Sequence, residues 1–186
     1  MKLLRNAINP FLAATVLTAV LALAVGCASS EEKEKRKEAS SLRLFLEQEF
    51  DPGDKTTLVP VFRANPVLVR IEKIPFLDEG HLIDAQLVDV VGGFAIVASF
   101  DFHGTLVLDN VSNSFRGRRI AIYSMFTDGR WLAAPVINGR VSDGRLVFTP
   151  DCTREEAERI VNGLNNVAIK LGNKPKPGKE PKEDNF

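Results

Sequence analysis

The chain has 186 residues, 26% of them charged, and its 24 basic residues balance its 24 acidic residues. A neutral chain of this composition lacks the basic surface that nucleic-acid-binding proteins need. Without its apolar N-terminal segment roughly 160 residues remain, enough for one domain with a single hydrophobic core.

The N-terminal segment is typical of an exported protein. Its apolar run from Phe11 to Val25 is shorter than the roughly 20 residues that span a bilayer, and it resembles the core of a signal peptide. The residues Leu-Ala-Val-Gly-Cys that end at Cys27 resemble a bacterial lipobox. We therefore expect residues 1–26 to be a lipoprotein signal peptide and Cys27 to be acylated, which would anchor the protein in the cell envelope, facing the periplasm or the cell exterior. An uncleaved anchor and ordinary secretion are the alternatives.

Two polar segments flank the predicted domain. Residues 27–41 centre on the run EEKEKRKE and cannot bury enough apolar surface to order themselves, so we expect a flexible tether. A contact of its lysines with anionic lipid is the alternative, which the interleaved glutamates weaken. Residues 172–186 are rich in Pro and Lys and are expected to form a disordered tail. The folded domain is then residues 42–171.

The first half of this domain is predicted to be mostly strands. Apolar residues alternate with polar ones in two stretches, and Gly92-Gly93 joins two apolar, β-branched runs in the manner of a hairpin. Asp78 is a candidate cap for a short helix. The elements expected are strands at 42–50 and 67–74, a helix at 78–85, and strands at 86–91 and 94–100.

The second half contains the two main helices. Asp101 is expected to cap a helix that ends near Phe115, and Thr153 with Glu156 fits a capping box before an amphipathic helix that ends near Leu171. Strands are expected at 120–126, 130–136 and 146–149. This order of elements predicts an α+β fold, with a largely antiparallel sheet and two main helices packed on one face.

Several runs in the second half resemble a known family. The match is specific in order and spacing but contains no catalytic signature. It is made of the runs Ala133–Ile137, Ser142–Arg145, Thr153–Ala157 and Gly163–Asn165, with weaker similarity in Phe100–Thr105 and Arg116–Ile122. Together they resemble the P1 head, part of the first periplasmic domain of SecD (SecDF), the accessory subunit of the export translocase.

The resemblance implies a SecDF P1-head-like fold and a domain that contacts emerging polypeptide during proton-driven export. SecD-like proteins carry several membrane spans with the proton-coupling residues. After Cys27 no apolar run of this chain approaches spanning length. We therefore expect a head domain on a lipid anchor that binds polypeptide and does not itself transduce proton-motive force.

The search for catalytic or metal-binding residues finds little. His81 and His103 are the only histidines, and neither has partners at zinc-ligand spacing, so no metal and no cofactor is expected. A hydrolase that uses Asp101, His103 or Cys152 is the least favoured hypothesis. It requires those side chains to converge in a pocket. We expect the protein not to be an enzyme.

One set of residues is a candidate binding surface. It consists of Arg116, Arg118, Arg119, Arg130 and Trp131, since arginine and tryptophan are enriched at binding hot spots. The alternative is that Trp131 fills the core between the sheet and the last helix while the arginines pair with Asp128, Asp143 and neighbouring acidic residues.

Two functions remain after these steps. The first is non-enzymatic binding of polypeptide, linked to protein export or folding, with unfolded chains or Sec translocase components as partners and the bilayer held through acylated Cys27. The second is an interaction module that docks on a single envelope protein or self-associates.

Overall fold

The computed structural model describes residues 37–51 and 53–175, which belong to one unit of the chain beginning at Lys37. The predicted signal peptide, the predicted acylation site Cys27 and most of the tether lie outside the described residues, as does most of the tail. In the described part of the chain, no helix is both long and apolar enough to cross a membrane.

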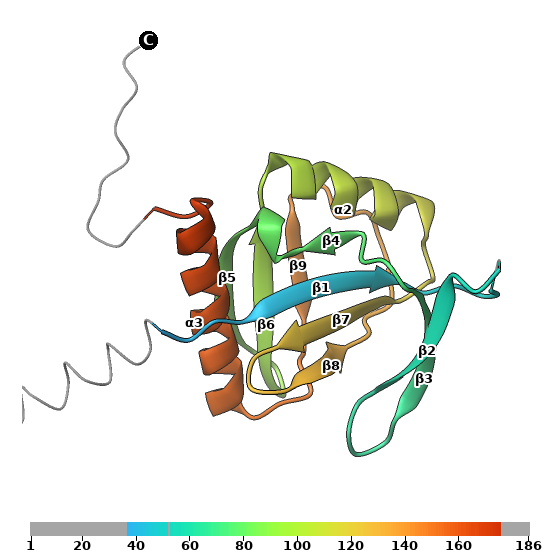
Figure 1. Ribbon diagram of the computed structural model, residues 1–186, viewed down its shortest axis with the longest axis horizontal. Coiled ribbons are helices and arrows are strands. Elements are labelled where there is room, and N and C mark those ends of the chain that lie inside the picture. The colour runs from blue at the N-terminus through green and yellow to red at the C-terminus, as the bar shows by residue number, and fades with distance from the viewer. Residues whose placement is uncertain (1–36, 52, 176–186) are drawn as a thin grey trace, which may run out of the picture. The chain divides into compact units, whose positions relative to one another are not determined.

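Four antiparallel strands form the first sheet (Figure 1), in the order β4 (Leu77–Asp78), β1 (Ser41–Leu46), β7 (Ile120–Met125) and β8 (Gly129–Ala133). Side chains alternate along β1. Leu42, Leu44 and Leu46 point into the main core, whereas Arg43 and Phe45 point to the opposite face. We call that opposite side the outer face of the four-stranded sheet.

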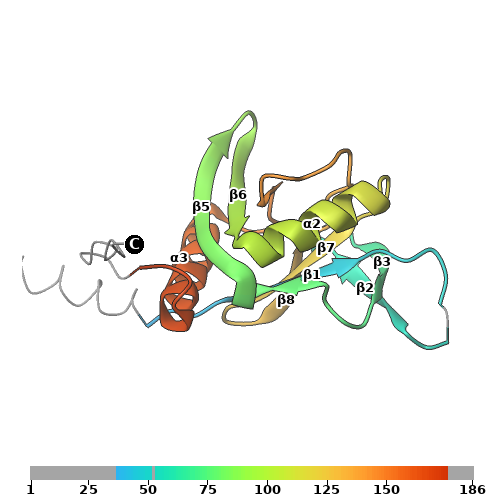
Figure 2. The same cartoon turned by 90° about the horizontal axis from the view of Figure 1, so that it is seen from above.

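A second antiparallel sheet contributes the other half of the main core. Its strands follow the order β5 (Leu82–Val90), β6 (Gly93–Phe100) and β9 (Arg145–Phe148). Figure 2 shows β5 and β6 as a curved hairpin that rises from the rest of the domain. Ile96 and Phe148 of this sheet belong to the same buried cluster as Leu44 and Ile122 of the first, so the core lies between the two sheets.

Two helices close this core. α3 (Arg154–Leu171) packs along β5, as Figure 1 shows, and α2 (Phe102–Ser114) contacts β4 and β6. Both begin at the predicted caps: the Asp101 carboxylate accepts a hydrogen bond from the Gly104 N–H at 2.7 Å, and the Thr153 hydroxyl accepts one from the Glu156 N–H at 3.3 Å. Gly172, in a left-handed conformation, ends α3.

A two-stranded hairpin stands beside the end of β1 (Figure 1) and packs against part of the outer face. It consists of β2 (Thr56–Val61) and β3 (Val67–Glu72), and we call it the arm. Its inward side chains form a second buried cluster with Phe45 and Ala121 of the first sheet and with Ala134, just after β8. These inward side chains are Val59, Val61, Val69 and Ile71. The arm therefore covers the end of the outer face to which these residues belong.

The predicted α+β class is confirmed, but the strands are divided among three antiparallel sheets. The helix predicted at 78–85 is wrong. Asp78 does act as a cap, yet it begins a single 3-10 turn (η1, Glu79–His81), after which Leu82 enters β5. Pairing of eight β5 residues with β6, around one bulge, outweighs the local helix signal.

Strand β2 is absent from the sequence-based prediction. It contains Pro60, and proline cannot donate a hydrogen bond to a strand ladder. The structure accommodates Pro60 on the exposed side of the arm, where it lies opposite Leu68 in a two-stranded sheet. Strand β2 pairs only with β3 and is an edge strand, a position that tolerates a residue without an N–H.

The segments that enter and leave the domain are anchored to it. Glu38 forms an ion pair with Arg159 of α3, and Ser40 is buried beside Gly163. After α3, the Asn173 amide donates to the carbonyl of Gly80 at 2.7 Å. The ordered domain is thus a few residues longer at each end than the predicted 42–171.

Candidate functional site

The outer face of the four-stranded sheet carries a row of side chains that crosses all four strands. In the strand register Arg43 lies opposite both Asp78 and Tyr123, and Tyr123 lies opposite Trp131. Directly opposed residues project to the same face, so these four side chains are neighbours. The row runs from an acid through a cation to two aromatic rings.

The aromatic half of this row is a small cluster. The Trp131 ring meets the Phe45 ring edge-on with centroids 5.2 Å apart, and it meets the Tyr123 ring in the same way at 5.1 Å. This geometry is the one that aromatic quadrupoles favour. Tyr123 and Trp131 remain half-buried because the arm covers only part of the cluster.

Between the arm and the uncovered aromatic rings lies a hollow of about 300 Å³, which we call the outer slot. Its lining is aromatic and aliphatic at the base and cationic at the rim. The residues that line it are Arg43, Phe45, Thr57, Ile71, Lys73, Tyr123, Met125 and Trp131. The slot is therefore apolar inside and positively charged at its edge.

The two cations at this rim differ in their pairing. Lys73 donates to the Asp54 carboxylate and to the Asp54 carbonyl, both at 2.8 Å. Arg43 is exposed, and its guanidinium has no hydrogen-bond or ion-pair partner among the described residues. Asp78, its cross-strand neighbour, accepts from the Gly80 N–H at 2.9 Å. Arg43 is thus free to bind an acidic group.

The other side of the arm is also apolar and exposed. Leu58 is 52% exposed and Leu68 67%, and at the base of the arm Phe50 is 68% and Ile74 76% exposed. We call these four side chains the apolar arm surface. A second hollow, of about 550 Å³, opens beside Phe50 and Ile74. Single exposed apolar residues are normal on protein surfaces, but four of them on one hairpin and its base are a patch.

The two hollows lie on opposite faces of the arm. Thr57 and Ile71, a cross-strand pair, line the outer slot, whereas the next pair, Thr56 and Glu72, lines the larger hollow. Successive pairs in a hairpin project to opposite faces. Lys73, just past the end of β3, lines both.

The structure separates the predicted arginine set. Arg118 and Arg119 pair with glutamates just after β1, Glu49 and Glu47 respectively, while Arg130 forms an ion pair with Glu156 at the start of α3. Arg116 is exposed on the loop after α2. Three of the four arginines are therefore paired with acidic residues, as the alternative expected, but their partners are Glu47, Glu49 and Glu156 and not the expected Asp128 and Asp143.

Trp131, the fifth member of the predicted set, lies on the outer face beside Phe45 and Tyr123. It does not fill a core between the sheet and α3. Sequence analysis missed Arg43, Phe45 and Tyr123. The alternation of β1 already placed Arg43 and Phe45 on one face, but the pairing of β1 with β7 is not visible in the sequence.

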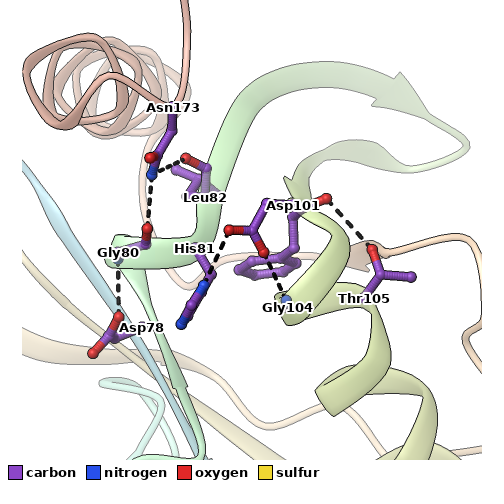
Figure 3. A network of polar contacts seen from close by, with 9 residues as sticks. Asp78, Gly80, His81, Leu82, Asp101, Gly104, Thr105 and Asn173 are labelled. Carbon is purple, nitrogen blue, oxygen red and sulfur yellow. Dashed lines mark hydrogen bonds and ion pairs between the residues drawn. The ribbon is translucent and has the colours of Figure 1, made fainter.

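A polar junction holds η1 against the start of α2 (Figure 3). The Asp101 carboxylate accepts from the Gly104 N–H and lies 3.1 Å from Nδ1 of His81. The His81 ring lies tilted against the ring of His103, with their centroids 4.7 Å apart. Partial burial would raise the pKa of Asp101, but the hydrogen bonds from Gly104 and His81 and the charges of both histidines lower it. No cluster of three metal-ligating side chains is present in the described segments.

Cys152 lies far from this junction. Its charged neighbours are Glu156, Arg63 and Asp151, and burial raises the pKa of its thiol to about 11. Cys152 precedes the N-terminus of α3, whereas Asn173, just past the C-terminus, contacts Gly80 beside His81. An 18-residue helix is roughly 27 Å long, so Cys152 does not converge with Asp101 and His103.

Comparison with protein-family models finds no match, and comparison with curated proteins finds none either. Among solved structures, the chain is similar to one described as a membrane component SecDF that enhances protein export. The TM-score is 0.52 at 21% sequence identity, over 75% of this chain and 68% of that one. It is also similar to SecDF in its super-membrane-facing form, with a TM-score of 0.52 and 20% identity over 75% of this chain and 20% of that one. The predicted SecDF P1-head-like fold is confirmed.

Proposed function

We propose that this protein is a non-enzymatic, polypeptide-binding domain of the cell envelope that supports protein export or folding. The observation that carries the proposal is the exposed apolar patch on the arm, next to two hollows, in a domain with a SecDF-like fold. An unfolded chain presents apolar side chains along an extended backbone. A protruding apolar hairpin with a hollow on each face offers them a place to bind.

The arm surface suits this role better than the nearest sheet edge. At β8 the Leu132 carbonyl already accepts from the Asp151 N–H at 2.7 Å, and β2 lies against the same strand. Addition of an extra strand there would have to displace these contacts. A side-chain-directed contact along the arm requires no such displacement.

The anchor is part of the same proposal. Acylation at Cys27 would hold the protein on a membrane. The charged segment that follows would let the domain reach polypeptides that emerge from that membrane. SecDF itself enhances protein export as a membrane component. By that analogy, Sec translocase components are the expected neighbours of this protein.

Titration with an unfolded polypeptide tests the proposal. A permanently unfolded, tryptophan-free chain, added at micromolar concentration, should change the fluorescence of Trp131, the sole tryptophan, and compete with a labelled apolar peptide. The variant Phe50→Ser/Ile74→Thr should bind several-fold more weakly, since each removed side chain contributes about 1 kcal/mol or more of apolar contact.

The control is Val91→Thr/Val147→Thr. Both valines are exposed apolar residues, and they lie outside the arm, at the β5–β6 turn and on β9. This control variant should bind unfolded polypeptide as tightly as the unaltered protein does. Equal weakening by both double variants, or no binding of several unrelated unfolded chains, would overturn the proposal. Binding of one folded envelope protein alone would favour the docking module instead.

A further inference from the structure

We propose that the outer slot recognises an apolar side chain followed by a carboxylate, with the apolar group against Phe45, Tyr123 and Trp131 and the carboxylate on Arg43. This inference rests on the proposed polypeptide-binding function and adds to it a preferred sequence. The occupant is an extended segment of another polypeptide that carries an aromatic or large aliphatic residue next to Asp or Glu.

The position of Arg43 carries the first step. It stands in the same cross-strand row as Tyr123 and Trp131, so its guanidinium and the aromatic rings flank one hollow. Of the two lining cations, Lys73 is paired with Asp54, whereas Arg43 has no partner in the part of the chain that the structure describes. Guanidinium binds carboxylate with two parallel hydrogen bonds, which fixes the orientation of the ligand.

The size of the slot carries the second step. A volume of about 300 Å³ is at the lower end of the range for binding pockets, so it suits one side chain and little more. Met125 at the rim is 52% exposed and supplies a flexible, polarisable wall that adapts to different apolar shapes. The slot is then selective for an apolar group in general and not for one residue.

The charge of the surroundings favours a polypeptide over a lipid surface. Attraction of a protein to anionic membranes takes a cluster of several lysines or arginines. At the slot there is one unpaired arginine and one lysine already bound to an aspartate. A single directed cation beside an aromatic hollow matches one carboxylate on one chain.

Three tryptophan-free peptides test the inference on the full-length chain. They are identical and extended except at the centre, which reads Phe-Glu, Phe-Gln or Ala-Glu, and binding is followed by Trp131 fluorescence. The Phe-Glu peptide should bind roughly three- to tenfold more tightly than Phe-Gln, the range between an exposed ion pair and a bidentate one. Ala-Glu should bind more weakly still.

Variants locate the effect. Arg43→Gln should bring the Phe-Glu and Phe-Gln affinities together, whereas Arg43→Lys should restore part of the difference. The control is Arg145→Gln, since Arg145 is another exposed strand arginine without an ion pair among the described residues. This variant should leave the difference between the Phe-Glu and Phe-Gln affinities unchanged.

Three other results would each contradict a different part of the proposal. Equal binding of Phe-Glu and Phe-Gln to the unaltered protein removes the carboxylate site and leaves the proposed function standing. No binding of any peptide or unfolded chain removes both. Saturation by vesicles of phosphatidylglycerol and phosphatidylcholine, lost in Arg43→Gln, would assign Arg43 to a lipid surface and contradict the inference.

Discussion

The Tyr123 phenol lies over the backbone of Gly129 so closely that a Cβ atom at residue 129 would stand 1.8 Å from the Tyr123 hydroxyl oxygen. The two residues belong to neighbouring strands, and Tyr123 makes one of the two ring contacts of Trp131. The absence of a side chain at 129 therefore leaves room for the Tyr123 ring, which is part of the lining of the outer slot.

Substitution of Gly129 tests this relationship. Gly129→Ala should push the Tyr123 ring away, shift the fluorescence of Trp131 and weaken peptide binding. Because Tyr123 is half-buried and the clash is with the far end of its side chain, the loss of stability should be near the low end for overpacking, about 1 kcal/mol. Gly139→Ala is the matched control, since nothing lies within 4 Å of an added Cβ there. Identical behaviour of the two variants would contradict the assigned role.

The contact between Gly163 and the entering chain gives a prediction of opposite sign to helix propensity. Alanine is the better helix former by about 1 kcal/mol, so propensity alone predicts that Gly163→Ala stabilises the protein. A Cβ at 163 would, however, lie 2.8 Å from the backbone nitrogen of Ser40 and 3.0 Å from the carbonyl carbon of Ala39. Backbone cannot give way as a side chain can. Thermal unfolding should show a lower Tm, and a higher Tm would mean that residues 38–40 are not held against α3.

The junction around Asp101 predicts that part of the protein's stability is lost in acid. Its pKa is lowered from the ordinary value of 3.8, so its stabilisation is complete above that value and is lost as pH falls through the lowered pKa. Asp101→Asn keeps a cap acceptor but removes the titration. The free energy of unfolding should differ by less than about 1 kcal/mol at neutral pH, given the exposure of this carboxyl, and the difference should shrink below pH 4. A difference that keeps growing below pH 4 would contradict the assignment.

The Cys152 thiol should react slowly with thiol reagents in the native protein. A rise of its pKa from 9.0 to about 11 lowers the thiolate fraction at pH 8 by about 100-fold, and the thiolate is the reactive form. In a Cys27→Ser background, the reaction with a thiol reagent should be slow in the native protein and fast in denaturant. Rapid reaction of native Cys152 would indicate an activated cysteine and revive the hydrolase hypothesis.

Local signals predicted much of this fold. Asp101 and Thr153 begin their helices as expected, and the Gly92-Gly93 pair does mark a tight hairpin. Each of these features depends on residues within a few positions of one another. The helix wrongly expected at 78–85 depended on local signals too, but there the pairing with β6 decided the outcome.

The site depended on long-range pairing. Arg43 lies beside Tyr123 because β1 pairs with β7, although the two residues are 80 positions apart in the sequence. Strand β2 is stabilised by the packing of its valines on Phe45 and Ala121 of the first sheet. The alternation of β1 shows that Arg43 and Phe45 share a face. It does not show which rings stand beside them. For that reason Trp131 was named from the sequence and its partners were not.

Crosslinking from single positions in living cells tests the central claim most directly. A photoreactive residue at Ile74, on the apolar arm surface, should capture many newly synthesised exported chains in their unfolded state. The same residue at Val91, which is fully exposed on the β5–β6 turn, should capture few. Capture of a single folded partner from Ile74, or equal capture from both positions, would contradict the claim that the arm binds unfolded polypeptide.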